Sequence, residues 1–354
     1  MNRIKQVVSI LLMLCCIMGL TACSQTKSDI IPEDYVIGVI RTIGNKNDSE
    51  ILYFNSDLEQ TGNTHYNYAT MGELFYPPVV YDGSVYIVPQ GQATKKDEKT
   101  ILQLDLDTLE QQRFALDQIA IYGISVDSSA IYAVNNINYV SYLSRIDKAE
   151  KTVKTLDYNG LYVSSAYVYN DMLYAFSSSQ DIGAQSTIHC INPTTMVEEK
   201  QIDITALGCD VRTVVGVGDI LYFVVCSDSN GDFNNIVGAF NTATGEISTI
   251  EFQKNVFHLL NVDNKLYVSH GNLVTCEGTA LSVYDIATTD ITTYDLGVWI
   301  GQIAVNGESL YVMGQHQIAK YDLHTLEKQA EKQIALDSGY YLSGIFSNLL
   351  NTDR

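Results

Sequence analysis

The sequence predicts an all-β protein, a seven-bladed β-propeller with four antiparallel strands in each blade. Three observations predict this fold: a pattern that recurs at a nearly fixed spacing, turn residues between short apolar segments, and no convincing long helix after the N-terminal segment. The composition agrees, because 46% of the 354 residues are apolar, only 18% are charged, and 24 are Tyr. Such a mixture suits paired strands and turns better than long, salt-bridged helices.

The first recurring pattern is a turn followed by an apolar residue and a tyrosine. Its tyrosines are 46, 42, 48, 45 and 44 residues apart. They are Tyr86, Tyr132, Tyr174, Tyr222, Tyr267 and Tyr311. A fixed period in this range indicates an array of supersecondary units, and four strands of about 5–6 residues fit into one period. A β-helix would have much shorter repeats, and two sandwiches would not keep one register, so the propeller is favoured.

The second pattern is an Asp or Asn followed by a short polar turn, and it follows each copy of the first. LDLDTLE from Leu104 and YDLHTLE from Tyr321 are examples, and an earlier FNSDLEQ from Phe54 brings the copies to seven. Six blades are therefore complete within the chain. The seventh combines the strands that begin at Tyr35 and Ser49 with the last strand, from Tyr340, which we expect to be innermost in that blade. This closure leaves no free strand edge at the seam, although six or eight blades are alternatives. The propeller domain is predicted to cover residues 35–354.

The repeated turn, LYV-like strand and YDxxT turn resemble the bacterial propellers grouped with the YVTN and quinoprotein-like repeats. The resemblance covers about Tyr35 to Asn348 and is specific for fold rather than function. The Gly-His and Trp-Asp signatures of WD40 blades and the double glycine of kelch blades do not occur. Quinone-dependent members carry a recurrent Trp in each blade, whereas Trp299 is the single Trp here. We therefore expect no cofactor.

The N-terminus has the layout of a secretory signal peptide in residues 1–22. Arg3 and Lys5 precede an apolar run that is too short to span a membrane comfortably. The ending LTAC resembles the bacterial lipobox, which implies that Cys23 receives diacylglycerol and becomes the first residue of the mature chain. Residues 23–34 then form a lipidated, polar tether, and the protein lies outside the cytoplasm, anchored to the cell membrane. The alternatives are an ordinary signal peptide and a cytosolic chain with an apolar start.

The charge is strongly negative, −20 for the whole chain. Removal of residues 1–22 leaves 19 basic against 41 acidic residues, a charge of −22. This balance argues against nucleic acid as a partner and against a body lying on anionic lipid, because both attract basic surfaces. Outside the signal and the lipid site, four cysteines remain, and they could pair in three ways. They are Cys190, Cys209, Cys226 and Cys276, and none has the CxxC spacing of a zinc site. A domain of this size has core enough to need no disulfide.

The usual catalytic motifs do not occur in the sequence, and the six histidines have no ligand-like spacing. One segment, DSNGDFN, places Asp228, Asn230 and Asp232 on alternate positions, as in the first half of a calcium loop. Position twelve of such a loop would be Ala239 rather than Glu. The segment is therefore more typical of a polar hairpin turn, with calcium as the alternative.

The candidate ligand site lies where the innermost strands begin, at one end of the channel, which we name the upper mouth. Counting back from the repeated tyrosines places an aromatic residue at six of these seven starts, with a charged pair and a histidine beside them. The candidate residues are Tyr76, Tyr122, Tyr162, Asp210, Arg212, Phe257, His258, Trp299, Tyr340 and Tyr341. Rigid aromatic faces beside a charge are common in binding sites, although a repeat could also keep an aromatic at one position for packing.

Three functions are consistent with the predicted fold, the N-terminal segment and the candidate site. The first is a non-catalytic binding or scaffold protein at the cell envelope, whose upper mouth binds a protein, peptide or glycan. The second is an exported enzyme of the lyase, lactonase or hydrolase kind, with Asp210, Arg212 and His258 at its centre. The third is a subunit of an envelope assembly that uses the blade sides. We favour the first, because the predicted inner strands are mostly apolar or hydroxylated rather than rich in His, Asp and Glu.

Overall fold

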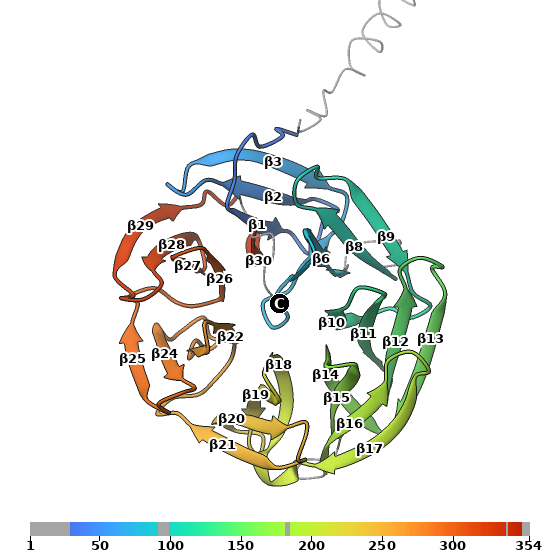
Figure 1. The fold of residues 1–354 in the computed structure, drawn as a ribbon. Coiled ribbons are helices and arrows are strands. Elements are labelled where there is room, and N and C mark those ends of the chain that lie inside the picture. The colour runs from blue at the N-terminus through green and yellow to red at the C-terminus, as the bar shows by residue number, and fades with distance from the viewer. Residues whose placement is uncertain (1–28, 91–98, 181–184, 338, 349–354) are drawn as a thin grey trace, which may run out of the picture.

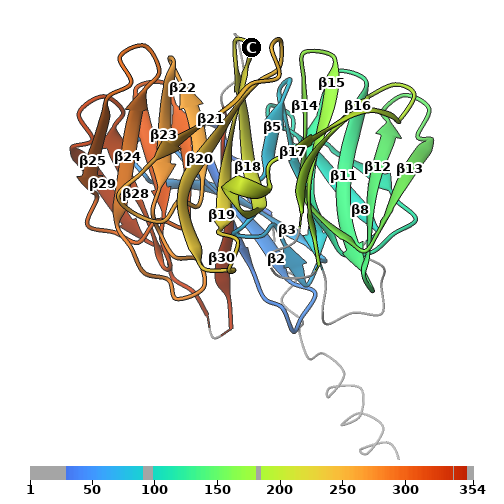
Figure 2. The same cartoon turned by 90° about the horizontal axis from the view of Figure 1, so that it is seen from below.

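The computed structural model describes residues 29–90, 99–180, 185–337 and 339–348. It consists of seven four-stranded antiparallel sheets arranged around a central axis (Figure 1). Figure 2, at right angles to this view, shows the strands of each blade crossing the thickness of the ring. The predicted seven-bladed propeller is thus confirmed.

The blades follow one another along the chain, and each is named here from its innermost to its outermost strand. Blade 1 contains β30 (Tyr341–Ser347), β1 (Ile37–Thr42), β2 (Ser49–Phe54) and β3 (Gln60–Tyr66), and blade 2 contains β5 (Val79–Tyr81), β6 (Ser84–Ile87), β8 (Thr100–Asp105) and β9 (Gln111–Ala115). Blade 3 contains β10 (Ile121–Val126), β11 (Ala130–Ile137), β12 (Val140–Asp147) and β13 (Val153–Asn159), and blade 4 contains β14 (Leu161–Tyr169), β15 (Met172–Ser179), β16 (Ser186–Asn192) and β17 (Val197–Asp203).

The second half of the ring repeats the same order. Blade 5 contains β18 (Cys209–Val217), β19 (Ile220–Ser227), β20 (Phe233–Asn241) and β21 (Ile247–Glu251), and blade 6 contains β22 (Leu259–Val262), β23 (Lys265–Ser269), β24 (Ala280–Asp285) and β25 (Ile291–Asp295). Blade 7 contains β26 (Gln302–Asn306), β27 (Ser309–Met313), β28 (Gln317–Asp322) and β29 (Lys328–Gln333). A short pair, β4 (Thr70–Met71) with β7 (Pro89–Gln90), and a 3₁₀ turn, η1 (Thr205–Leu207), lie outside the blades. Nowhere in the described ranges is there a helix long and apolar enough to span a membrane.

Both repeated patterns now have a physical explanation. The six repeated tyrosines lie on the second strand of their blades and are all buried. In the second pattern, the leading Asp or Asn forms a turn with its own backbone: Asp322 Oδ1 accepts hydrogen bonds from the backbone N–H groups of His324 (3.0 Å) and Thr325 (2.8 Å). The same bonds recur two and three residues after Asp105, Asp147, Asn192, Asn241 and Asp285. These side chains fix the turn between the third and fourth strands, as Asx turns do.

The core lies between neighbouring blades rather than in one central mass. Phe176 of blade 4, for example, contacts Phe223 of blade 5, with ring centroids 5.1 Å apart, and both are buried. Because each blade covers the apolar face of the next, the ring must close to bury its first and last faces.

The ring closes as the sequence predicts, with β30 innermost in blade 1 and antiparallel to β1. The ring of Phe346 lies against Gly38, where an added Cβ would come within 2.1 Å of its Cζ. Glycine is therefore required at this seam, because any side chain would displace the buried aromatic ring. At the outer edge of the same blade, Ile30 pairs with Asn63 of β3 and covers part of the exposed strand.

The four cysteines outside the N-terminal segment, Cys190, Cys209, Cys226 and Cys276, are all free thiols. Cys15, Cys16 and Cys23 lie outside the described residues.

Candidate functional site

The upper mouth of the channel is occupied by a segment of the chain itself. The connection between β3 and β5 enters the centre of the ring, and its residues 72–78, GELFYPP, are named the plug here (Figure 1). Gly72 turns the chain inward with a φ of 74°, and its N–H donates to the carbonyl of Val88 (3.0 Å). An added Cβ on Gly72 would lie 3.1 Å from the carbonyl oxygen of Ser343, so the close approach to β30 favours glycine.

Gln302, the first residue of β26, holds the plug to blades 7 and 1. Its Nε2 donates to the carbonyls of Glu73 (2.8 Å) and Leu74 (3.1 Å), and its Oε1 accepts from the N–H of Ile345 (3.1 Å). The side chain of Gln302 is fully buried. Since buried peptide groups need partners, this one amide fixes two carbonyls of the plug and one N–H of the closing strand.

Tyr76 holds the other side of the plug, against blades 3 and 4. Its hydroxyl donates to the carbonyl of Ser164 (3.0 Å), and its ring centroid lies 6.2 Å from that of Tyr122. Burial and the nearby Tyr162 raise the pKa of Tyr76 well above its ordinary value. The phenol is therefore a neutral hydrogen-bond donor rather than an acid–base group.

Asp210 and Arg212, from β18, form an ion pair beside the plug. Arg212 donates to Asp210 Oδ2 from Nε (2.8 Å) and from its second terminal nitrogen (2.7 Å). The guanidinium carbon lies 4.2 Å from the ring centroid of Phe75 and 5.7 Å from that of Tyr76. Burial lowers the pKa of Arg212, but Asp210 and Tyr76 together outweigh burial and raise that pKa above its ordinary value. Arg212 is therefore engaged on one side by a carboxylate and on the other by two aromatic rings of the plug.

His258 lies behind the plug and is 3% exposed. Burial, with the charge of Arg212, lowers the pKa of its imidazole to about 4. Neither ring nitrogen makes a well-formed hydrogen bond within the described residues. A neutral, enclosed imidazole of this kind has no route to a substrate in the channel.

Glu73 is the ionisable group that the plug itself carries. Burial raises the pKa of its carboxyl to about 7, while the nearby Arg212 opposes that shift. Its Oε2 is buried and has no partner among the described residues.

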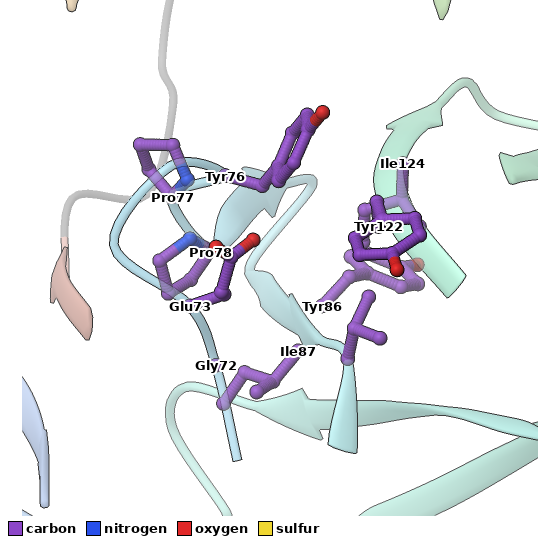
Figure 3. Close-up of a pocket in the computed structure, with 10 residues that line it drawn as sticks. Gly72, Glu73, Tyr76, Pro77, Pro78, Tyr86, Ile87, Tyr122 and Ile124 are labelled. Carbon is purple, nitrogen blue, oxygen red and sulfur yellow. The ribbon is translucent and has the colours of Figure 1, made fainter. Parts of the chain in front are cut away.

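Glu73 also lines a small hollow beside the plug, which has room for about one water molecule. Figure 3 shows Glu73 with Pro77 and Pro78 on one side of this hollow and Tyr122 with Ile124 on the other. The hollow is therefore far smaller than a small-molecule site.

The sequence-predicted residues therefore separate into two groups. Tyr76, Tyr122, Tyr162, Asp210, Arg212 and His258 come together around the plug. Phe257, Trp299 and Tyr340 pack elsewhere at the same end of the ring, whereas Tyr341 lies near Glu73 of the plug: burial and the charge of Glu73 raise the pKa of Tyr341.

Each of the first three has a different local partner. Phe257 is buried, 5.5 Å from the ring of Phe233, and Trp299 donates from Nε1 to the carbonyl of Asn272 (3.2 Å). Tyr340 hydrogen-bonds Asp48 and lies under the guanidinium of Arg41, and Tyr341 is exposed.

Glu73, Phe75 and Gln302, which form or hold the plug, were not among the residues predicted from the sequence. The sequence does contain a signal for the plug. The connection between β3 and β5 is long, and Pro77 and Pro78 disfavour a strand or a helix there. The other connections between blades are shorter, and an unusually long connection often has a structural or functional role of its own.

Asp228, Asn230 and Asp232 form a self-contained turn between β19 and β20. Asp228 Oδ1 accepts from the N–H groups of Asn230 (2.8 Å) and Asp232 (3.0 Å). In the part of the chain that the structure describes, no three His, Cys, Asp or Glu side chains are grouped to hold a metal. The geometry is that of a polar hairpin turn, so the calcium hypothesis gains no support from it.

One further constellation has the form of a catalytic triad. His189 Nε2 is 2.7 Å from Ser177 Oγ, and His189 Nδ1 is 2.6 Å from Glu198 Oε2. Ser177 and His189 are both buried inside blade 4, so a substrate carbonyl cannot reach the hydroxyl. This network satisfies the polar atoms of a buried histidine.

The loops of the upper face carry exposed large apolar side chains, named the collar here. They are Ile119, Tyr139, Phe233, Val274 and Tyr341. Tyr139 is 77% exposed at the tip of the β11–β12 hairpin and has a φ of 65°, which is unfavourable for a bulky residue. Exposed apolar side chains at one end of a domain are candidate contacts for a partner.

No family model matches the chain, and no curated protein matches it. Solved structures do match. A protein of unknown function from Desulfotomaculum acetoxidans is 11% identical, with a TM-score of 0.60, and the match covers 88% of this chain and 99% of that one. AztD from Citrobacter koseri is 8% identical with a TM-score of 0.54, covering 89% and 98%. The dihydro-heme d1 dehydrogenase NirN is 12% identical with a TM-score of 0.55, covering 92% and 78%.

These similarities show the fold alone, because the identities are so low. The chain is thus a seven-bladed β-propeller whose upper mouth is filled by its own plug. This fold occurs in proteins with unrelated functions, so the fold by itself indicates none of them.

Proposed function

We propose that this protein is a binding or scaffold protein of the cell envelope, anchored by lipid on Cys23, that engages a protein, peptide or glycan partner with its upper face. The observation that carries the proposal is the collar, five large apolar side chains that are exposed at the upper end of the ring. Aromatic and apolar anchors on a rigid rim are the usual core of a binding surface.

The enzyme alternative has less support from the geometry. Asp210 and Arg212 are paired with each other, and His258 lies behind the plug. A general acid or base must reach the proton that it transfers, whereas His258 is buried and the partly exposed Asp210 and Arg212 are bound to each other.

The test is a comparison of two apolar surfaces of the same protein. The full-length protein, Phe233→Ser/Val274→Ser, and a control, Val197→Ser/Ile291→Ser, are each cross-linked in envelope membranes and their partners quantified. The control residues are also exposed but lie on the outer strands β17 and β25. We expect the collar variant alone to lose its partner. Loss in the control alone would instead support an assembly through the blade sides.

A further inference from the structure

The described chain enters the fold at the upper end of blade 1. Asp29 lies beside His65, close to the upper end of β3, where its carboxylate accepts a hydrogen bond from the N–H of His65 (2.8 Å). Ile30 then exchanges two backbone hydrogen bonds with Asn63 (2.9 and 2.8 Å), as in an antiparallel pair. The segment therefore runs from the upper end of β3 toward the lower turn, and Asp29, its first described residue, lies at the upper end.

The contact between this segment and β3 fixes the entry point. An added Cβ on Gly62 would lie 2.5 Å from the carbonyl oxygen of Ile30 and 2.7 Å from the nitrogen of Pro32, so glycine lets the segment lie directly on the strand. Nε2 of His65 lies 3.2 Å from Oε1 of the buried Glu50, while Nδ1 faces the segment. The strand beneath thus determines where the segment lies.

The entry point is close to Cys23 along the chain. Asp29 is six residues after Cys23. A fully extended chain covers at most about 3.6 Å per residue, which gives about 22 Å for six residues. A lipid on Cys23 would therefore keep the upper end of blade 1 within about 22 Å of the bilayer, whatever path these residues take.

Two orientations of the ring satisfy this limit. The ring could stand on the outer edge of blade 1, or its upper face could be turned toward the bilayer. Ile30 and Ile31 are exposed at that edge, but standing on it would also bring the polar outer strands of the neighbouring blades, β9 and β29, toward the lipid. The upper face instead presents the collar, so the distribution of exposed apolar side chains favours the second orientation.

We propose that the upper face is turned toward the membrane and that the collar binds an integral membrane protein, which meets it next to the lipid with apolar and basic side chains. The proposal rests on the lipid anchor and the binding role of the upper face proposed above, and it adds the class of partner. Exposed acids lie beside the collar: Asp232 precedes Phe233, and Glu277 follows Val274 by three residues. These carboxylates suit a basic partner and are repelled by anionic lipid, so the lipid surface itself is the less favourable occupant.

The test uses Trp299, the single Trp of the chain, as a fluorescent donor at the upper end of blade 7. The lipidated full-length protein is inserted into phosphatidylcholine vesicles that contain a dansyl-labelled lipid as the acceptor. The matched variant Trp299→Phe/His324→Trp, its fold checked by circular dichroism, carries its single Trp on the exposed turn between β28 and β29, about 20 Å away at the lower end. We expect energy transfer to the lipid to be severalfold more efficient from Trp299, because transfer falls steeply with distance.

A second variant keeps Trp299 and changes only the tether. A Gly/Ser linker of about 12 residues inserted before Asp29 lets the ring move away from the bilayer, so transfer from Trp299 should fall. In envelope membranes, the partner that is cross-linked to the collar should resist carbonate extraction, as integral membrane proteins do.

Equal transfer from the two Trp positions, or more from the lower one, would overturn the orientation. Transfer that stays high with the long linker would mean that the upper face binds lipid itself, and a partner that carbonate releases would not be an integral membrane protein; either result contradicts the partner class. Failure of the proposed function is distinct. If the vesicles do not retain the protein, the lipid anchor is wrong, whereas a retained protein with its lower end nearer the lipid contradicts only this inference.

Discussion

Gln302→Leu offers the sharpest test of the plug, because this one buried side chain joins the plug to the closing strand. The amide makes three hydrogen bonds, of 2.8, 3.1 and 3.1 Å, to Glu73, Leu74 and Ile345. Leucine has a similar volume and can make none of them. At about 1 kcal/mol for each bond, we expect unfolding to require about 3 kcal/mol less free energy.

Two measurements check this expectation. Urea unfolding followed by circular dichroism gives the free energy of unfolding, and hydrogen exchange with mass spectrometry gives the protection of residues 70–78. Gln333→Leu is the control, because Gln333 is exposed on β29 and should change stability by less than about 0.5 kcal/mol. The reasoning is refuted if Gln302→Leu is as stable as the control and the plug exchanges at the wild-type rate.

Three more predictions follow from the same geometry. Arg212→Met should destabilise the fold by about 3 kcal/mol in urea unfolding, because it leaves Asp210 without its partner, and Asp210→Asn in the same chain should restore most of that loss. Glu73→Gln should be more stable than wild type at about pH 8 but not at about pH 5. Burial raises the pKa of Glu73 from 4.5 to about 7, so the protonated carboxyl stabilises the fold at low pH, and this stabilisation is lost as the pH rises through about 7. The lowered pKa of His258 makes the free energy of unfolding fall as the pH falls. This contribution is the same in wild type and in Glu73→Gln, so it cancels in the difference between them. Cys23→Ala should release the protein from membranes in cell fractionation, and unchanged retention would refute lipid anchoring.

The fold was predictable because its signals are local and repeated. Each copy of the Asx turn and of the buried tyrosine satisfies a short-range requirement, so the period could be read without any long-range contact. The closing strand was predictable by counting, since six complete blades leave one that needs a partner for Ile37–Thr42.

The site was predictable only in part. Tyr76, Tyr122, Tyr162, Asp210, Arg212 and His258 do come together, because each sits at or near the start of an inner strand. What fills the space between them could not be predicted, since the plug departs from the repeat. Glu73 and Gln302 meet across 229 residues, and no local pattern records such a contact.

The separation of Phe257 and Trp299 from this cluster has a similar reason. Both occupy the predicted positions at the starts of inner strands. Their rings turn toward Phe233 and toward the β23–β24 loop instead of the axis. Position along a strand was thus predictable, whereas side-chain direction depends on neighbouring loops.

The central claim is that the upper face is the binding face of this propeller. It is tested most directly by hydrogen exchange on the full-length protein with and without its cross-linked partner. We expect new protection in the loops that carry Tyr139, Phe233 and Val274, together with the plug. Protection confined to the outer strands β17 and β25, with the collar unchanged, would contradict the claim.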